Sequence, residues 1–126
     1  MSVELWAKDG LFDRLHEACR PSWDAYVDHP FVHGLAGGTL PIASFRHYLA
    51  QDYVFLIHYA RAWALAVYKS STLAEMRKAT ASVKAIVERE TGMHVEYCKG
   101  WGLSEADMEA MPEDRATMAY TRYVLE

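Results

Sequence analysis

Hydrophobic residues recur every three or four positions along most of this 126-residue chain, which is the spacing of one face of an α-helix. The pattern predicts a first helix over residues 10–28, which Pro21 kinks or restarts. The helix ends before Pro30, because the residue that precedes a proline is disfavoured in the helical conformation. A short turn over residues 31–35 and a Gly-Gly break at 37–38 follow.

A second long helix is predicted from about residue 39 to residue 69, with Pro41 near its first position, where a missing N–H costs nothing. Its middle section, YVFLIHYARAWALAVY, is apolar nearly all round, which is typical of a helix with neighbours on several sides. The polar residues 70–72 break and cap the chain before a third long helix, from residue 73 to about residue 97. Gly92 lies inside that helix, and we expect it to mark a close packing contact.

Two shorter helices complete the pattern. Ser104 and Asp107 have the spacing of a capping box and start a short helix that stops at Pro112. The last helix begins near Asp114 and carries an apolar face made of Ala119, Tyr120, Tyr123 and Val124. That face runs to the final residue without a helix stop signal, so we expect a truncated chain. With no strand signal anywhere, the sequence predicts one all-α helical bundle domain over residues 1–126.

Composition and charge narrow the possible partners. The chain is 52% hydrophobic and 24% charged, which is enough to form a packed core. Its net charge of −4 includes no basic stripe, so nucleic acid is not an expected partner. The apolar stretch over residues 53–68 is interrupted by His58 and Arg61 and is too short to span a bilayer, and the first residues do not resemble a secretion signal. We therefore expect a cytoplasmic protein without membrane contact.

One polar residue interrupts an aromatic stripe on the second long helix. The stripe follows spacings of three and four, and its members are Phe45, Tyr48, Asp52, Phe55, Tyr59 and Trp63. A buried carboxylate is costly, so Asp52 must have a hydrogen-bond donor, a cation or a ligand as its partner. A structural bond to a neighbouring Tyr, Trp or Arg is the simpler interpretation, and a ligand is the functional one.

The third long helix repeats this arrangement. Its expected face consists of Met76, Thr80, Val83, Val87, Glu90, His94, Tyr97 and Trp101. Glu90 and His94 are four residues apart, so one can hydrogen-bond the other. The pair could bind a metal, act as acid and base, or lock two helices together. Di-iron bundles use a Glu-x-x-His spacing of three and repeat it, so the spacing here favours a structural pair over a metal site.

Other candidate groups are weaker. Cys19 lies on the apolar face of the first helix and reads as a small core residue. Cys98 has no cation or helix N-terminus nearby that would activate its thiol. The remaining histidines are interpreted as surface or packing residues: His16, His29, His33, His47 and His58. The sequence contains no phosphate-binding loop, zinc spacing or nucleophile elbow.

The stretch HPFVHGLAGGTLPIASFRHYLAQDYVFL, from His29 to Leu56, resembles the signature of the TenA family, also called thiaminase II. The Glu90-x-x-x-His94 pair and the Ala119-Tyr120-Thr121 segment are also similar to the family pattern. The resemblance covers essentially the whole chain. Proteins of the family extend well beyond this length, so the chain resembles their N-terminal part.

The resemblance implies an all-α fold like that of haem oxygenase, assembled as a homotetramer and using no metal or organic cofactor. It also implies a hydrolase of thiamin salvage that converts an amino-aminomethyl-methylpyrimidine, a breakdown product of thiamin, to hydroxymethylpyrimidine. Some members of the family also cleave thiamin. The expected partner is therefore a small pyrimidine.

The resemblance also assigns roles to individual residues. Asp52 matches the carboxylate that contacts the ring nitrogen and amino group of the pyrimidine, and Tyr120 matches a tyrosine that helps position or activate the catalytic cysteine. Phe55 stands where the family often has Tyr, which keeps the ring and loses the hydroxyl. Face geometry adds Tyr48, Tyr59 and Phe45 as neighbouring walls, and Glu90 and His94 as a supporting or structural pair.

The family's catalytic cysteine and acid/base glutamate lie in the C-terminal half, and neither Cys19 nor Cys98 matches that cysteine. This chain is therefore expected to hold part of a substrate site without the main reacting groups. Two alternatives stay open at this point. One is a non-catalytic pyrimidine-binding or regulatory module, and the other is a metal-dependent oxygenase on the same scaffold that uses Glu90 and His94.

Overall fold

The computed structural model describes residues 7–126, and every regular element in this range is a helix. The prediction of an all-α fold is therefore confirmed. The chain divides into two compact units, Met1–Pro41 and Ile42–Glu126. Within the described range, no helix is both long and apolar enough to cross a membrane.

The first unit contains three short helices, α1 (Leu11–Ala18), α2 (Arg20–Val27) and α3 (Pro30–Ala36). The single helix predicted over residues 10–28 is divided at Cys19, whose φ of −112° and ψ of 16° lie outside the α-helical region. Pro21 falls in the first turn of α2, where a proline is tolerated, so it restarts the helix as expected.

The turn predicted over residues 31–35 is wrong, because this segment forms α3. Pro30 occupies the first turn of α3, and Nδ1 of His29 accepts a hydrogen bond of 3.1 Å from the backbone N–H of Phe31. His29 thus acts as an N-cap, a role usually filled by Ser, Thr, Asp or Asn. The His-Pro pair therefore ends one helix and begins the next.

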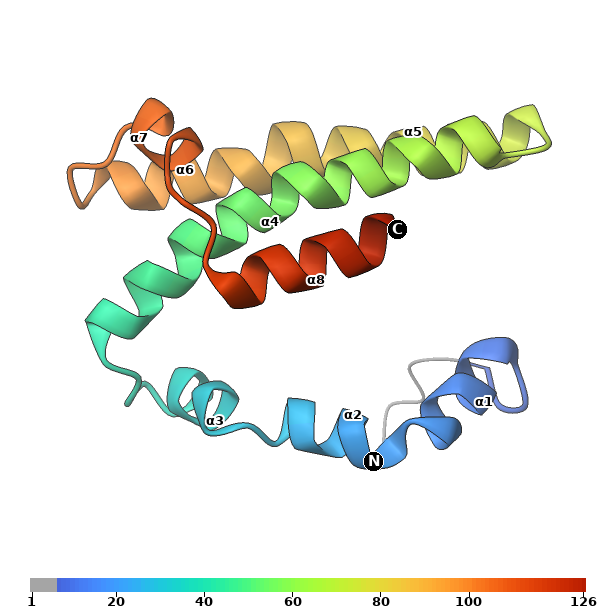
Figure 1. Ribbon diagram of the computed structural model, residues 1–126, viewed down its shortest axis with the longest axis horizontal. Coiled ribbons are helices and arrows are strands. Elements are labelled where there is room, and N and C mark those ends of the chain that lie inside the picture. Colours follow the sequence, from blue (N-terminus) through green and yellow to red (C-terminus); the bar gives the residue numbers. More distant parts are fainter. Residues whose placement is uncertain (1–6) are drawn as a thin grey trace. The chain divides into compact units, whose positions relative to one another are not determined.

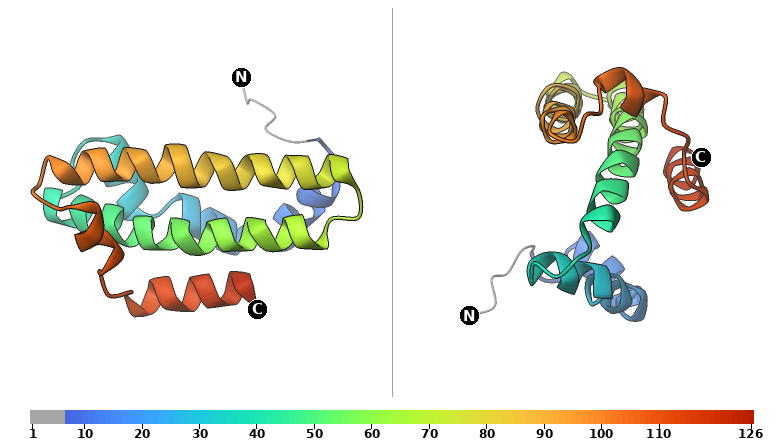
Figure 2. Two further views of the ribbon diagram at one scale, coloured as in Figure 1. Left: turned by 90° about the horizontal axis from the view of Figure 1, so that it is seen from above. Right: turned by 90° about the vertical axis from the view of Figure 1, so that its left-hand side faces the viewer.

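The second unit is arranged around α4 (Ile42–Lys69), a helix of 28 residues. A long helical segment returns alongside it (Figure 1) and consists of α5 (Leu73–Lys84), the π-helix η1 (Ala85–Glu90) and α6 (Thr91–Lys99). The short α7 (Glu105–Glu109) then leads to α8 (Arg115–Leu125). Both views in Figure 2 place α4 between the α5–α6 segment and α8. The prediction that the apolar second helix is central is confirmed for this unit.

Local sequence signals account for two helix starts. Thr72 and Glu75 form a capping box at α5, in which each side chain bonds the backbone N–H of the other residue. Ser104 and Asp107 form the predicted capping box at α7. In each case the box satisfies N–H groups that have no partner inside the helix.

The predicted inward face of the third long helix is only partly right. His94 is buried, as expected, whereas Met76, Val87 and Tyr97 are 37%, 56% and 61% exposed. Ala79, Ile86 and Cys98, which were not assigned to that face, are buried instead. Part of this helix is a π-helix, whose turns contain more residues than α-helical turns.

Two further expectations about packing are wrong. A Cβ placed on Gly92 would meet no atom within 4 Å, so this glycine does not mark a close contact among the described residues. On α8, Thr121 is the buried residue, and Tyr120 and Tyr123 of the predicted apolar face are exposed. The contact between α8 and α4 includes a hydrogen bond from Thr117 to Gln51, which apolar periodicity alone could not reveal.

The core of the second unit is a cluster of Leu49, Tyr53, Cys98 and Met108. These residues come from α4, α6 and α7, so the cluster ties the short α7 to the two long helices. Met108 is 0% exposed, whereas Met93 on α6 is 53% exposed.

Replacing Met108 with alanine is expected to lower the free energy of unfolding by about 2–5 kcal/mol, because it leaves a cavity in this cluster. The matched control, Met93→Ala, removes the same atoms from an exposed position and should change it by no more than about 0.5 kcal/mol. Urea denaturation followed by circular dichroism measures both values. Equal losses in the two variants would contradict the assignment of the core.

Candidate functional site

Asp52 and His94 meet across α4 and α6. Oδ2 of Asp52 lies 2.8 Å from Nε2 of His94, and the imidazole ring is buried. The partner that a carboxylate on an apolar stripe requires is therefore a histidine 42 residues further along the chain. The sequence analysis placed both residues correctly on inward faces but did not pair them.

The second ring nitrogen of His94, Nδ1, is protonated, as its hydrogen-bond partner shows. Nδ1 lies 2.8 Å from the backbone carbonyl oxygen of Glu90, which can only accept, so Nδ1 carries a proton. Nε2 faces a carboxylate, which also accepts when ionised. The hydrogen bond to Asp52 raises the pKa of His94 above 6.5, and burial acts in the opposite direction. The contact therefore favours the protonated imidazole beside an ionised carboxylate.

The expected bond between Glu90 and His94 is present, but it uses the backbone carbonyl of Glu90 and not its carboxylate. This is the ordinary i to i+4 spacing at the start of α6, where the carbonyl of Glu90 lies within reach of the following turn. Glu90 therefore orients the imidazole through its main chain, and its side-chain chemistry is not part of the Asp52–His94 contact.

Asp52 keeps some of its acceptor capacity open. Its side chain is 26% exposed, and a carboxylate offers more acceptor positions than the one that His94 occupies. Any further partner must donate a hydrogen bond, because an ionised carboxylate has no proton to give. The geometry therefore selects N–H or O–H donors, or a cation.

Three aromatic rings from α4 and α8 form a stack. The ring of Phe55 lies 5.3 Å from that of Tyr59 at an interplanar angle of 19°, and 5.4 Å from that of Tyr120 at 23°. These distances and near-parallel planes fit offset stacking. We call Tyr59, Phe55 and Tyr120 the ring stack. It unites three of the aromatic residues that the sequence analysis assigned to the site.

Tyr48 belongs to a different aromatic group near the start of α4. Its ring lies 6.4 Å from that of Phe45, which also contacts Tyr97 and Trp101 at 6.4 Å and 5.9 Å. The placement of Tyr48 as a wall of the same site stays a prediction.

The two cysteines occupy contrasting positions. Cys98 is fully buried, and burial raises the pKa of its thiol, which disfavours the thiolate that a nucleophile requires. Cys19 was expected in the core, but it is exposed at the break between α1 and α2. It lies in the first compact unit, whereas Asp52 and the ring stack lie in the second.

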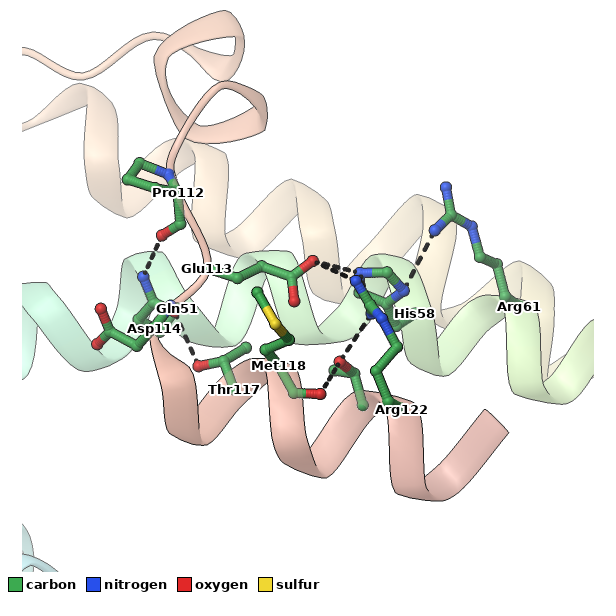
Figure 3. Close-up of polar contacts among 10 residues, drawn as sticks. Gln51, His58, Arg61, Pro112, Glu113, Asp114, Thr117, Met118 and Arg122 are labelled. Atoms are coloured by element: carbon green, nitrogen blue, oxygen red, sulfur yellow. Dashed lines mark hydrogen bonds and ion pairs between the residues drawn. The ribbon is translucent and has the colours of Figure 1, made fainter. Parts of the chain in front are cut away.

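Gln51 makes a polar contact with α8 that the sequence analysis missed (Figure 3). Its Nε2 donates to the carbonyl of Pro112 at 3.0 Å. Its Oε1 accepts from the backbone N–H of Asp114 at 2.9 Å and from the hydroxyl of Thr117 at 2.8 Å. Asp114 is the N-cap of α8 but makes no capping bond with its own side chain, which contacts His47 instead. The start of α8 is therefore capped by a side chain of α4.

His58 makes the second polar contact, two helical turns further along α4. Nδ1 of His58 lies 3.2 Å from Nη1 of Arg61. Its Nε2 lies 2.8 Å from Oε1 of Glu113 and 3.4 Å from Nη1 of Arg122. The bond to His58 lowers the pKa of Glu113, and the charge of Arg122 acts in the same direction. The other carboxylate oxygen of Glu113 is buried without a partner among the described residues.

The sequence did contain a signal for these contacts. Gln51, Phe55 and His58 follow one another at spacings of four and three, so they share a face of α4. A glutamine and a histidine on a nearly all-apolar helix need partners for the same reason that Asp52 does. His58 was interpreted as a surface or packing residue because periodicity does not indicate a partner 55 residues away.

Comparison with known proteins identifies the family. A model of the TENA/THI-4/PQQC family matches residues 16–126. The chain belongs to this family. Asp52, His94 and the ring stack all lie within the matched range.

Several curated relatives of this TenA-family chain carry names from thiamin metabolism. It is 37% identical over 111 residues to the aminopyrimidine aminohydrolase of Halalkalibacterium halodurans, a match that covers 88% of this chain and 50% of that protein. It is 40% identical over 111 residues to the putative hydroxymethylpyrimidine/phosphomethylpyrimidine kinase 2 of Schizosaccharomyces pombe, covering 88% and 20%. An uncharacterized protein of Haemophilus influenzae is 42% identical over 116 residues, covering 92% and 54%.

A solved structure supports the same fold. The chain is similar to the crystal structure of a TenA family transcription regulator from Silicibacter sp. TM1040, with a TM-score of 0.86 and 48% identity. The match covers 90% of this chain and 51% of that one. The TenA-family chain thus spans about half the length of this protein and of the bacterial relatives above.

The Asp52–His94 pair should be visible in a titration. We expect the pKa of His94 to lie above 6.5 in the folded protein and to fall in Asp52→Asn, which removes the negative charge. Because the folded pKa is the higher one, the pair stabilises the fold fully below pH 6.5. This stabilisation is lost as the pH rises through the folded pKa.

An NMR titration of the His94 ring measures this shift. Glu90→Gln is the matched control, since it leaves the backbone carbonyl bonded to Nδ1 in place, and it should move the pKa much less than Asp52→Asn. An unchanged His94 pKa in Asp52→Asn would show that the two side chains do not share a proton.

Proposed function

We propose that this chain supplies the pyrimidine-contacting part of a hydrolase that acts on aminopyrimidine breakdown products of thiamin and forms hydroxymethylpyrimidine. The observation that carries the proposal is the partly exposed carboxylate of Asp52, which a contact with His94 holds in place. Asp52 lies on α4, the helix that also carries Phe55 and Tyr59. The names of the Halalkalibacterium halodurans and Helicobacter pylori relatives, both aminopyrimidine aminohydrolases, support it.

The hydrogen-bonding capacity of Asp52 fits such a substrate. An aminopyrimidine presents an exocyclic NH₂ group, and its ring nitrogen becomes a second donor when it is protonated. A carboxylate that can only accept favours this protonated ring, which attracts electrons more strongly. The 2.8 Å contact with His94 holds the carboxylate of Asp52 in place. A pyrimidine with a carbonyl in place of the amino group would lose one of these bonds.

The ring stack offers a complementary contact. Phe55 is stacked on Tyr59 and on Tyr120, so the exposed outer ring Tyr120 presents the aromatic face of the size of a pyrimidine, and such a ring contributes binding free energy by offset stacking. Phe55 carries no hydroxyl, so its contribution is limited to packing. In this proposal Asp52 sets the orientation of the substrate and the rings hold its plane.

The reaction replaces the side-chain amine with a hydroxyl. A nucleophile attacks the methylene carbon next to the ring, or the ring position that activates it, and the carbon–nitrogen bond breaks as the amine leaves with a proton. Water then releases the alcohol and regenerates the nucleophile. The nucleophile is not Cys98, which is buried, so we place it with the acid/base group in a part of the full-length gene product beyond this chain. We propose no cofactor, and by family resemblance a homotetramer.

A second candidate follows from one name. The similar Silicibacter protein is described as a transcription regulator, so a pyrimidine-binding module without turnover is the alternative. Asp52 and the ring stack would serve binding equally well in that case. The two candidates differ only in whether the bound pyrimidine is changed.

Turnover by the full-length gene product separates them. We expect release of hydroxymethylpyrimidine from the amino-aminomethyl-methylpyrimidine without added metal, detected by mass spectrometry. Calorimetric binding of the same compound with no product formed would favour the regulatory module. Neither binding nor turnover by the folded protein would overturn both candidates.

Asp52→Asn should lower kcat/KM by roughly 10- to 100-fold, since a bond to a charged group contributes about 1.5–3 kcal/mol. His94→Leu is the matched variant, because leucine has no hydrogen-bond donor, so it breaks the same pair but leaves the carboxylate for the substrate. Its loss should be smaller than that of Asp52→Asn. Equal losses would mean that the pair acts only by holding α4 and α6 together, and that Asp52 does not touch the substrate.

A further inference from the structure

The position of Tyr120 depends on how α8 is attached to α4. Tyr120 is exposed, and its ring stacks on that of Phe55. The buried residue of α8, Thr121, has a hydroxyl that donates to the carbonyl of Met118 and so stays within its own helix. A stacked ring on an exposed position is free to slide unless its helix is fixed elsewhere.

Polar contacts on both sides of Phe55 provide this fixation. Gln51 precedes Phe55 by one helical turn, and His58 follows it by nearly one turn, on the same face of α4. Gln51 bonds the chain at the start of α8, and His58 bonds Glu113, whose carboxylate also contacts Arg122 near the other end of α8. Figure 3 shows the polar contacts of Gln51 and His58. Phe55, which stacks on Tyr120, lies between these two anchors along α4.

Of the two anchors, Gln51 makes the larger number of hydrogen bonds to the segment at the start of α8. It is 8% exposed, and its single amide group bonds the carbonyl of Pro112 before α8, the backbone N–H of its N-cap Asp114 and the hydroxyl of Thr117 in its first turn. Three bonds to one side chain restrain both the position and the rotation of this first turn. Tyr120 lies one turn after Thr117, so a rotation at Thr117 moves its ring directly.

We propose that Gln51 is a positioning residue for the pyrimidine site: by capping α8 from α4, it holds the ring of Tyr120 over Phe55. The proposal rests on the function proposed above, in which the ring stack binds the pyrimidine. Gln51 itself contacts no substrate. Its neighbour Asp52 orients the ligand, so adjacent residues of α4 set the two sides of one site.

Gln51→Met tests the proposal, because methionine keeps the length and volume of the side chain and removes all three bonds. NMR of the full-length gene product with labelled Phe and Tyr rings provides a readout that needs no ligand. We expect the nuclear Overhauser contact between Tyr120 and Phe55 to be lost in Gln51→Met, while the contact between Phe55 and Tyr59 within α4 persists. A retained Tyr120–Phe55 contact would overturn the proposal.

A double-mutant cycle with Tyr120→Ala provides the functional readout. Gln51→Met should lower kcat/KM for the aminopyrimidine by roughly 10- to 100-fold, the effect of a ring displaced by about 1 Å. On the Tyr120→Ala background the same substitution should cost almost nothing, because the residue through which it acts is gone. If Gln51→Met lowered kcat/KM by the same factor with and without Tyr120, Gln51 would act through general stability and not through Tyr120. That result would overturn the proposal.

Thr117→Val serves as a second variant if Gln51→Met fails to fold, since it removes one of the three bonds and leaves α4 intact. It should weaken the Tyr120–Phe55 contact and lower kcat/KM by a smaller factor, again only when Tyr120 is present. Failure of the proposed function has a separate signature, because the unmodified protein itself would then show no turnover. The ring contact in Gln51→Met still decides whether Gln51 positions Tyr120.

Discussion

Three polar side chains on one long, largely apolar helix must all find partners, and the arrangement of the second unit follows from this requirement. Gln51, Asp52 and His58 lie in the middle of α4, where an unpaired polar group would be costly. Asp52 meets His94 on α6, and Gln51 and His58 meet the segment that leads into α8. Each partner is more than 40 residues away along the chain. The polar groups of α4 thus specify which helices lie beside it, while the apolar ones mainly exclude water.

Helix type and approximate extent could be predicted wherever the signal is local. The boundary of α4, the restart at Pro21 and the capping box at Ser104 each depend on residues within one turn of each other. The helix α3 was missed because histidine is an unusual N-cap and the segment is only seven residues long. The π-helix was missed because periodicity arguments assume a constant number of residues per turn.

The candidate site was predictable in its members more than in its contacts. A carboxylate on an aromatic stripe pointed to Asp52, and a second inward polar residue pointed to His94, but nothing in their spacing indicates that they pair. The expected contact between Glu90 and His94 is present, but the sequence did not show that it uses the backbone carbonyl of Glu90, since a side-chain pattern says nothing about a carbonyl. Gln51 was not singled out because its sequence neighbours do not indicate its partners. Those partners lie in and just before α8, more than 60 residues later in the chain.

Because the start of α8 is capped by Gln51 of α4, its local stability depends on the contact between the two helices. The helix α5 begins with its own capping box, so its first turn can form before it meets a neighbour. At the start of α8 the donors and acceptors are satisfied by Gln51, which lies more than 60 residues earlier in the chain. Helix formation and docking of α8 are therefore one cooperative event. An opening that separates α8 from α4 also unwinds its first turn, so its amide protons exchange with solvent as a unit. The ring of Tyr120 stays in the stack only for as long as that unit remains closed.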